Sequence, residues 1–440
     1  MSGIALGLWS FVILLGMVFA RVPIGLAMFL CGGIGYWIIT GTPWPLLNQL
    51  KTVTFSTFSS YDFSVVPLFL LMGQFAAYGG ISGKLFRNAE NWLGHRKGGI
   101  AMATIGACAG FGAICGSSMA TAATMSQVAL PELRRNGYSG ALATGTLAAG
   151  GTLGILIPPS IILVIYASLT EQNIAKLFVA AFIPGILAAL GYALAIRIYV
   201  HFHPEEGTRL ERKPYGQRFR DLAGIWDIMI VFVLVLGGIY GGFFTPTEAA
   251  AFGALGCGLI AWARGGMTRE KLMEAVIYTA VASAMMFFIV LGAGLYNSFL
   301  ALTQLPQQAA EIVVGFGLSP WTILSAILIL YLILGGPMDS LSMILLTIPI
   351  FFPIIMSLDF GLTPEETAIW FGILVLISVE VGLISPPVGM NLFIIQSMAK
   401  DVPTGQVFRG VIPFIISDVI RTIILVVFPS ITLWLLRTLY

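Results

Sequence analysis

The sequence has little charge for its length. Only 10% of its 440 residues are Asp, Glu, Lys or Arg, against about 25% in an average soluble domain. Hydrophobic residues make up 58%, and the mean hydropathy is +0.95. The net charge of +2 gives no argument for a nucleic-acid partner. This composition excludes an ordinary soluble domain. Because many apolar stretches are about 20 residues long, it predicts an all-α, polytopic membrane protein.

Cysteine and histidine are also scarce. The four cysteines all lie in apolar stretches, so no disulfide framework is expected. The three histidines lie in polar segments, and the sequence contains no HExxH and no CxxC. We therefore expect neither a metal-dependent membrane enzyme nor an organic cofactor. The first apolar run, from Ile4 to Ala20, has no basic segment before it. We expect it to be a retained span and not a cleaved signal peptide.

Lysine and arginine are absent from some connecting segments and gathered in others. Four segments are basic, namely 80–98, 131–138, 201–222 and 263–271. The positive-inside rule predicts that these four are cytoplasmic. The segments 303–319 and 357–366 contain no Lys or Arg and are predicted to lie outside. This assignment places both termini outside, with 44–60 as an external or interfacial arm.

Two apolar segments have both flanks on the same predicted side. Segment 98–131 has cytoplasmic flanks and segment 320–356 has external flanks, so each is interpreted as a re-entrant helical hairpin. The predicted tips are "GFGAICGSSMAT" (110–121) and "LGGPMDSLS" (334–342), where Gly, Ser and Pro interrupt the apolar run. Two adjacent full spans would satisfy the same flanks. About ten other runs are expected to cross the membrane: 4–20, 22–42, 62–79, 139–169, 176–200, 223–243, 245–263, 272–302, 367–399 and 405–437.

The two halves of the chain share a motif. "GILIPPSIILVIYAS" (154–168) aligns with "GLISPPVGMNLFIIQS" (382–397), and the double prolines coincide at an offset of 228. We therefore expect a first repeat over 1–200, a cytoplasmic linker over 201–222 and a second repeat over 223–440. Each repeat holds one hairpin and one broken helix, 139–169 or 367–399. Five crossings separate equivalent elements, so the repeats are predicted to be inverted, as in many secondary transporters.

Helix breaks leave backbone groups without intrahelical partners. Carbonyl and hydroxyl oxygens suit a hard cation, and half-helix N-termini suit an anion. The sequence predicts two sodium sites flanking a substrate anion, although any single break could be only a satisfied kink. Site 1 comprises Gly112, Gly116, Ser117, Ser118, Ile157, Pro158 and Pro159. Site 2 comprises Gly336, Asp339, Ser340, Ser385, Pro386 and Pro387. The substrate set is Ser118, Thr121, Ser160 and Asn391.

Three further acidic positions lie in apolar runs. Asp339 at a hairpin tip is costly in a membrane unless it is partnered, and a cation site or a structural cap would each explain it. Glu380 precedes the second break and is either a proton or cation relay or a structural hydrogen-bond acceptor. Asp418 and Arg421 are spaced i, i+3, which predicts a local ion pair.

Five motifs in order resemble the large membrane subunit of tripartite ATP-independent periplasmic (TRAP) transporters, in the ion-transporter superfamily. They are "GSSMATAATMSQVALPELRRNGYS" (116–139), "GTLGILIPPSIILVIYA" (151–167), "LFVAAFIPGIL" (177–187), "GGPMDSLSMILLTIPIFFPI" (335–354) and "SPPVGMNLFIIQSMA" (385–399). The resemblance implies a sodium-coupled elevator-type symporter in a bacterial inner membrane. It also implies a small four-helix membrane subunit and a periplasmic substrate-binding protein as partners. Ser385 stands where family members often have Thr.

The implied cargo is an organic acid anion such as a C4-dicarboxylate, a keto acid, a sugar acid or sialic acid. Two alternatives remain open from the sequence. One is a stand-alone sodium- or proton-coupled carboxylate carrier of the same superfamily. The other is a membrane scaffold subunit without a translocation site. A channel is disfavoured because no ring of pore-lining charges is apparent.

Overall fold

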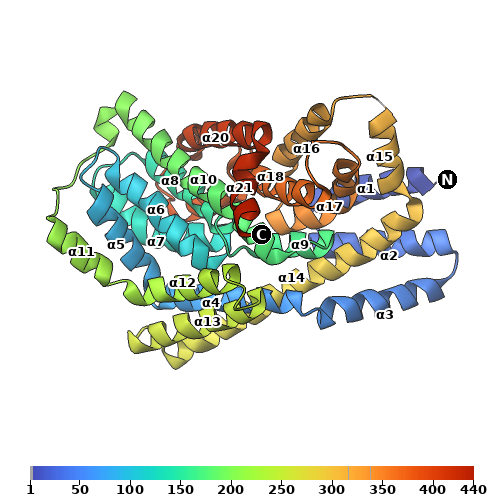
Figure 1. Cartoon of the computed structure of the whole chain (residues 1–440), viewed down its shortest axis with the longest axis horizontal. Coiled ribbons are helices and arrows are strands. Elements are labelled where there is room, and N and C mark those ends of the chain that lie inside the picture. The colour runs from blue at the N-terminus through green and yellow to red at the C-terminus, as the bar shows by residue number, and fades with distance from the viewer. Residues whose placement is uncertain (1–2, 316, 337) are drawn as a thin grey trace.

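The computed structural model describes residues 3–315, 317–336 and 338–440. Over these residues the chain is built from helices and contains no strand (Figure 1). The helices are α1 (Gly3–Phe19), α2 (Ile24–Thr40), α3 (Pro43–Ser59), η1 (Asp62–Ser64), α4 (Val65–Tyr78), α5 (Ile81–Leu93), α6 (Gly99–Cys115), α7 (Ser118–Arg135), α8 (Gly140–Leu156), α9 (Ile161–Thr170), α10 (Ile174–Phe202), η2 (Pro204–Glu206), α11 (Tyr215–Ala223), α12 (Trp226–Tyr240), α13 (Pro246–Ala263), α14 (Arg269–Thr303), α15 (Leu305–Gly315), α16 (Pro320–Leu334), α17 (Ser340–Met356), α18 (Pro364–Ile384), α19 (Met390–Met398), α20 (Thr404–Val427) and α21 (Pro429–Leu439).

Several of these helices have the length and composition of membrane spans. Four single helices of the described chain qualify, namely α10, α14, α18 and α20, and three bent pairs raise the number to as many as seven. Shorter apolar helices include α1, α2, α6, α16 and α17. The all-helical, multi-pass membrane architecture is therefore confirmed. The expected total of about ten crossings stays a prediction.

Both predicted hairpin segments are pairs of helices with the break inside the predicted tip. The chain turns from α6 to α7 at Gly116, whose φ of +64° lets its N–H donate to the carbonyl of Gly112 at 2.8 Å. Gly is the residue that adopts this left-handed conformation at little cost. The second pair, α16 and α17, is joined by residues 335–339. Pro337 in that tip lies outside the described residues.

Both double prolines lie between two helices. The first separates α8 from α9, whose axes differ by 43°. The second separates α18 from α19. The peptide bonds Pro158–Pro159 and Pro386–Pro387 are both cis. Proline lacks an N–H and clashes with the preceding turn, which explains why each helix ends where it does.

The segment of the last predicted crossing, 405–437, contains two helices, of which α20 is long and apolar enough to span a membrane. The structure has α20 and α21, separated by Phe428 with φ −122° and ψ 75°. Because Pro429 follows, the helical conformation is disfavoured at Phe428. Helices also occupy connecting segments for which we made no helix prediction, namely α5, α11 and α15. In α5 the apolar side chains of Ile81 and Phe86 are buried together with the polar Ser82, Asn88 and Asn91, while Arg87 is exposed.

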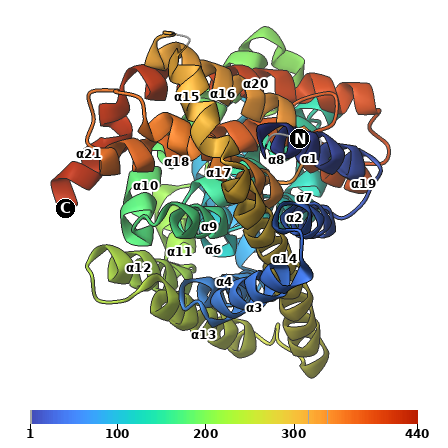
Figure 2. The ribbon, with the colours of Figure 1, turned by 90° about the vertical axis from the view of Figure 1, so that its right-hand side faces the viewer.

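The elements form two parts that both views show one above the other. The lower part contains α3, α4, α12 and α13, the upper part contains α16, α18 and α20, and the long helix α14 runs diagonally from the lower part towards the upper one (Figures 1 and 2). Two helices are almost entirely enclosed. Every residue of α8 from Leu142 to Leu156 is buried, and so is every residue of α18 from Thr367 to Ile384.

Helix α8 is rich in Gly and Ala, which lets neighbouring backbones approach it closely. A Cβ atom added at Gly145 would lie 2.1 Å from the carbonyl oxygen of Gly410 in α20. A Cβ added at Gly151 would lie 2.7 Å from the Cβ of Ala122 in α7. On a third side, a Cβ added at Gly112 of α6 would lie 2.5 Å from the Cα of Gly154. At these glycines, three helices therefore contact α8 with no side chain larger than the methyl group of Ala122 between them.

Candidate functional site

The first hairpin tip packs directly on the first helix break. A Cβ added at Gly116 would lie 3.3 Å from the carbonyl oxygen of Pro159. A Cβ added at Gly154 would lie 2.8 Å from the carbonyl oxygen of Ser117. The contact buries Gly112, Gly116 and both prolines, and Ile157 is only 8% exposed. The structure thus brings together the residues that the sequence assigned to site 1.

Two helix N-termini begin in this first pair. Ser117 Oγ accepts a hydrogen bond from the N–H of Ala120 at 3.4 Å and caps α7. Ser160 Oγ accepts one from the N–H of Leu163 at 3.4 Å and caps α9. A helix N-terminus carries a partial positive charge, whereas the ends of α6 and α8 present carbonyl groups. The N–H groups at the starts of α7 and α9, which could bind an anion, therefore lie close to the carbonyl groups at the ends of α6 and α8, which could bind a cation.

The second pair repeats one contact of the first. A Cβ added at Gly382 of α18 would lie 2.6 Å from the Cα of Gly335 at the end of α16. Gly382 is the residue that aligns with Gly154. The sequence assigned Gly336 to the site, but the close backbone approach is made by Gly335. A Cβ added at Gly336 would meet nothing nearer than 3.6 Å.

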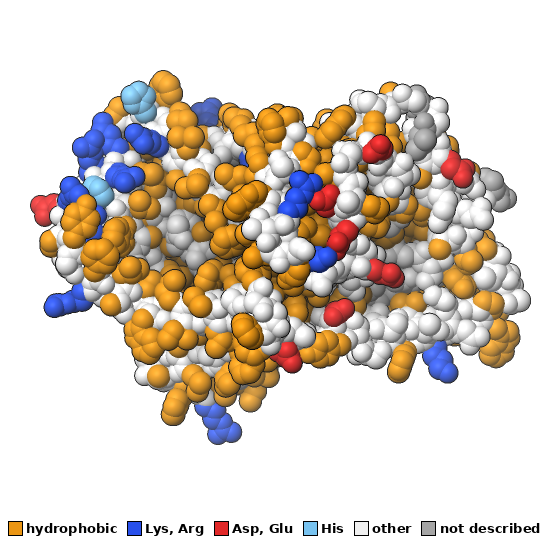
Figure 3. All heavy atoms as spheres, viewed as in Figure 1, with side chains coloured by type: hydrophobic (Ala, Val, Ile, Leu, Met, Phe, Trp, Pro, Cys, Tyr) orange, Lys and Arg blue, Asp and Glu red, His pale blue; other side chains and the backbone are white. Residues whose placement is uncertain are grey.

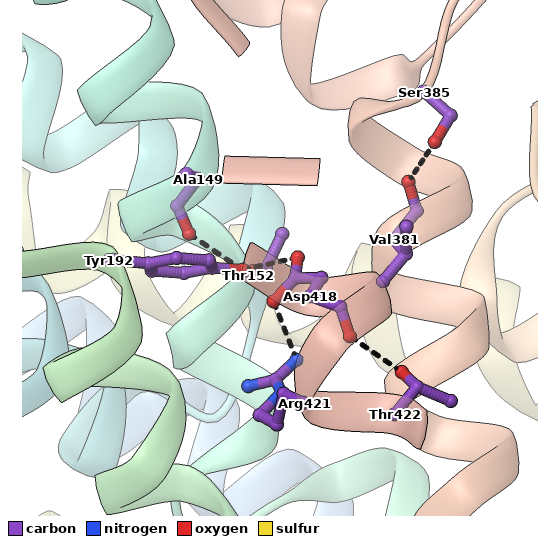
Figure 4. Close-up of polar contacts among 8 residues, drawn as sticks. All are labelled: Ala149, Thr152, Tyr192, Val381, Ser385, Asp418, Arg421 and Thr422. Carbon is purple, nitrogen blue, oxygen red and sulfur yellow. Dashed lines mark hydrogen bonds and ion pairs between the residues drawn. The ribbon is translucent and has the colours of Figure 1, made fainter. Parts of the chain in front are cut away.

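Asp339 caps the N-terminus of α17. Its Oδ2 accepts a hydrogen bond from the N–H of Ser342 at 3.2 Å, and its Oδ1 accepts one from the Ser342 hydroxyl. The structural cap that the sequence left open is present, and it leaves the carboxylate half-buried. Ser385, at the end of α18, donates from its hydroxyl to the carbonyl of Val381 at 2.7 Å (Figure 4).

The two breaks differ in exposure. Pro158 and Pro159 are buried, whereas Pro386 and Pro387 are exposed. Ser340, beside the second tip, is 5% exposed. The second break therefore has an open face that the first does not have.

Glu380 connects the second pair with the first. It is 1% exposed, and its Oε1 accepts a hydrogen bond from the Ser340 hydroxyl at 3.2 Å. Ser118, at the start of α7, also neighbours this carboxylate. The structural hydrogen bond is therefore confirmed. The relay stays a prediction, and the second oxygen, Oε2, has no hydrogen-bond partner among the described residues.

The substrate set is buried near the helix starts. Ser118, Thr121, Ser160 and Asn391 are each at most 1% exposed. Asn391 on α19 donates from Nδ2 to the carbonyl of Ala148 in α8 at 3.5 Å, while its Oδ1 is buried without a partner in the described structure. Thr121 lies beside the thiol of Cys115. Because α19 contacts both α7 and α8, Asn391 belongs to the same region as the first tip.

A polar network next to this region joins α8, α10 and α20 (Figure 4). The Tyr192 hydroxyl donates to Asp418 Oδ2 at 2.7 Å and lies 3.0 Å from Thr152 Oγ1. Arg421 Nη2 lies 2.8 Å from Asp418 Oδ1, which confirms the predicted local ion pair. Both charged residues are nearly fully buried. The sequence did not indicate Tyr192 and Thr152, because each is one polar residue in a long apolar run.

Metal-binding chemistry beyond a hard monovalent cation has no support in the described residues. They contain no group of three or more His, Cys, Asp or Glu side chains that could hold a metal ion. The oxygen atoms at the two tips come from carbonyls, hydroxyls and one carboxylate. This donor set fits a hard cation and not a soft one.

Paired helical hairpins and interrupted helices in an all-helical membrane fold are an architecture typical of secondary transporters. A solved structure shares this fold. The crystal structure of the YdaH transporter from Alcanivorax borkumensis matches with a TM-score of 0.61 and 14% identity, over 88% of this chain and 89% of that one.

Sequence comparison gives the family. The model of the tripartite ATP-independent periplasmic transporter, DctM component, matches residues 11–431. A C4-dicarboxylate TRAP transporter large permease protein DctM from Pseudomonas aeruginosa is 36% identical over 389 residues, which are 88% of this chain and 89% of that protein. A sialic acid TRAP transporter large permease protein SiaM from Vibrio cholerae is 29% identical over 96% of each chain. The chain belongs to the DctM family of TRAP transporter large permeases, a family of transport proteins and not of enzymes.

Proposed function

We propose that this chain is the translocating subunit of a sodium-coupled, binding-protein-dependent symporter that imports an organic acid anion. The observation that carries the proposal is the packing of each hairpin against a broken helix. Gly112 meets Gly154 in one pair, and Gly335 meets Gly382 in the other. When a hairpin packs on a broken helix, the backbone carbonyls and helix N-termini at the two interruptions lie next to one another, as in the binding sites of many secondary transporters.

Sodium coupling is supported by the chemistry of the two tips. At the first tip the backbone oxygens of Ser117 and Pro159 lie close to Gly154 and Gly116, respectively. At the second tip the carboxylate of Asp339 adds a negative charge. Hard cations prefer oxygen ligands of these kinds. We assign one sodium ion to each tip.

The cargo class is supported by the helix N-termini and by the relatives. The starts of α7 and α9 present positive dipole ends, and Asn391, whose amide can orient a carboxylate, lies on α19, which contacts α7. The relatives described above are named for C4-dicarboxylate and for sialic acid. Both are organic acids, so we extend that class, and no single member of it, to this chain.

The partners follow from the family name. A tripartite transporter has two further components, which we propose to be a small four-helix membrane subunit and a periplasmic substrate-binding protein. We further propose an elevator movement in a bacterial inner membrane. In it, the part with both hairpins and both broken helices moves against α3, α4, α13 and α14. The two halves, 1–200 and 223–440, would be inverted repeats joined by 201–222.

The experiment that tests the proposal is uptake by proteoliposomes that contain the chain and its small membrane subunit. The binding protein, loaded with a radiolabelled organic acid, is supplied outside under an imposed sodium gradient. We expect uptake only when both the gradient and the binding protein are present. Uptake without the binding protein would support the stand-alone carrier instead. Binding of the partners without any uptake would support a scaffold subunit.

A further inference from the structure

A basic cleft of about 960 Å³ opens where the turn between α5 and α6 meets the end of α10. Its polar lining consists of His95, Arg96, Lys97, Arg197, His201 and Arg209. No acidic residue lines it in the part of the chain that the structure describes. Figure 3 shows Lys and Arg side chains gathered at this end of the molecule, while most acidic side chains on that face lie toward the other half.

The fold brings these cations together from three separate segments. The N–H of Leu210 donates to the carbonyl of Gly94 at 3.0 Å, which places Arg209 beside the turn that carries Arg96. A Cβ added at Gly98 would lie 3.0 Å from the Ile196 side chain, so the same turn packs on α10. Arg197 and His201 follow one another at i, i+4 on that helix, on the same side of it.

The cationic side chains of the cleft are not ion-paired within the described structure. The ion pairs found among the described residues leave out Arg96, Lys97, Arg197 and Arg209. These four side chains are exposed. The nearby Glu206 is bonded instead to Ser139 and to the Tyr199 hydroxyl. Desolvation and then the charges of Arg218, Arg212 and Arg96 lower the pKa of His95.

An apolar groove continues from this cleft. The groove has a volume of about 610 Å³ and runs between α10 and α20. Leu194, Ile198 and Phe202 line both the cleft and the groove. The cleft and the groove therefore form one continuous surface, with cationic side chains at one end and apolar side chains along the rest of its length. Basic pockets next to membrane helices are typical binding places for anionic lipid head groups.

We propose that this surface binds an anionic phospholipid, with the phosphate held by Arg96, Arg197 and Arg209 and one acyl chain in the groove between α10 and α20. The lipid would be drawn from the leaflet on the basic side of the protein, which the positive-inside rule makes the cytoplasmic one. The bound lipid would fix the end of α10 to the turn that precedes α6. This site is independent of the cargo and of sodium coupling.

The test is a lipid titration of the purified, delipidated full chain in detergent, followed by native mass spectrometry. Phosphatidylglycerol and phosphatidylcholine with identical acyl chains are compared. We expect phosphatidylglycerol to bind at least about tenfold more tightly, because each cation near an anionic lipid contributes to binding. Equal binding of the two lipids would overturn the proposal. So would complete displacement of phosphatidylglycerol by inorganic phosphate or sn-glycerol 3-phosphate, which would indicate a site for a soluble phosphate.

Two variants test where the lipid head group and the acyl chain bind. Arg96→Gln/Arg197→Gln/Arg209→Gln should lower phosphatidylglycerol affinity to the phosphatidylcholine level. Its control, Lys51→Gln/Arg269→Gln/Lys400→Gln, removes the same charge at exposed positions elsewhere and should leave the selectivity unchanged.

Ile198→Trp should fill the groove and weaken binding of both lipids severalfold. Leu255→Trp, at a position that is 59% exposed on α13, should not. Selectivity that survives the triple variant would contradict the site. The lipid comparison on the unmodified chain decides the question even if a variant fails to fold.

Discussion

Asp339 has two separable roles at the second tip, a cap and a charge. Both of its oxygens accept hydrogen bonds from Ser342, so the residue fixes the start of α17. Asparagine caps helices about as well as aspartate. A substitution can therefore remove the negative charge while it retains most of the cap.

We predict that Asp339→Asn raises the sodium concentration needed for half-maximal uptake at least about tenfold, because the variant loses the negative charge at that tip; a tenfold change corresponds to about 1.4 kcal/mol. The thermal midpoint should change little. Uptake at graded sodium concentrations measures the effect. Asp359→Asn, at an exposed position outside both tips, is the matched control. An unchanged sodium response in Asp339→Asn would mean that the second cation lies elsewhere.

Gly112 has no room for a side chain. We predict that Gly112→Ala destabilises the chain by about 1–3 kcal/mol, because its Cβ would lie 2.5 Å from the Cα of Gly154. Gly106→Ala in the same helix is the control, since its nearest contact would be the Cβ of Ala89 at 3.8 Å. Alanine favours a helix interior over glycine, so the control should be neutral or stabilising. Thermal unfolding in detergent compares the two, and equal midpoints would contradict the packing.

At the scale of elements, the buried network of Figure 4 holds α20 to α8 and α10. Arg421 and Asp418 lie in an apolar environment, so the removal of one partner leaves an uncompensated charge. The removal of both charges avoids that penalty. We therefore expect the effects of substitutions at positions 418 and 421 on the free energy of unfolding to be strongly non-additive.

We predict that Arg421→Met lowers the free energy of unfolding by about 3–5 kcal/mol. The double variant Asp418→Asn/Arg421→Met should be more stable than Arg421→Met alone. Asparagine at position 418 retains an oxygen that can accept from the Tyr192 hydroxyl. A double-mutant cycle from thermal unfolding in one detergent measures the coupling. Additive losses would show that the two side chains do not interact as the structure describes.

The sequence predicts elements well where one residue type decides the backbone. The double prolines at Pro158 and Pro386 cannot be accommodated inside regular helices at low cost, so both breaks could be located in advance. The break between α20 and α21, at Phe428, was not predicted. A single proline such as Pro429 in an apolar run also occurs inside helices, as Pro184 does in α10.

Contacts between distant residues could not be predicted in the same way. Glu380 lies between Ser118 and Ser340 only because α7 and α17 come together in space. The choice of Gly335 over Gly336 as the partner of Gly382 depends on the rotation of α16. Neither of these two contacts can be inferred from the spacing of apolar residues along the sequence.

At the scale of the whole molecule, the distribution of charge predicts one orientation in the membrane. We predict that a membrane-impermeant maleimide labels Ser357→Cys from outside and Gly216→Cys only after the membrane is permeabilised. Both positions are exposed, and the four native cysteines are buried. Labelling of intact and lysed spheroplasts distinguishes the two. The reverse pattern would invert the proposed topology.

The glycines of α8 have a mechanical consequence. At Gly154, Gly151 and Gly145 this helix meets α6, α7 and α20 at distances that leave no flexible side chain between them. A soft side chain can change rotamer and absorb a sliding motion, but contacts this close to the backbone cannot. We therefore expect these four helices to move together as one rigid body. In the proposed elevator movement, large displacements would then be taken up where the chain leaves this body, and the first hairpin tip would keep its shape.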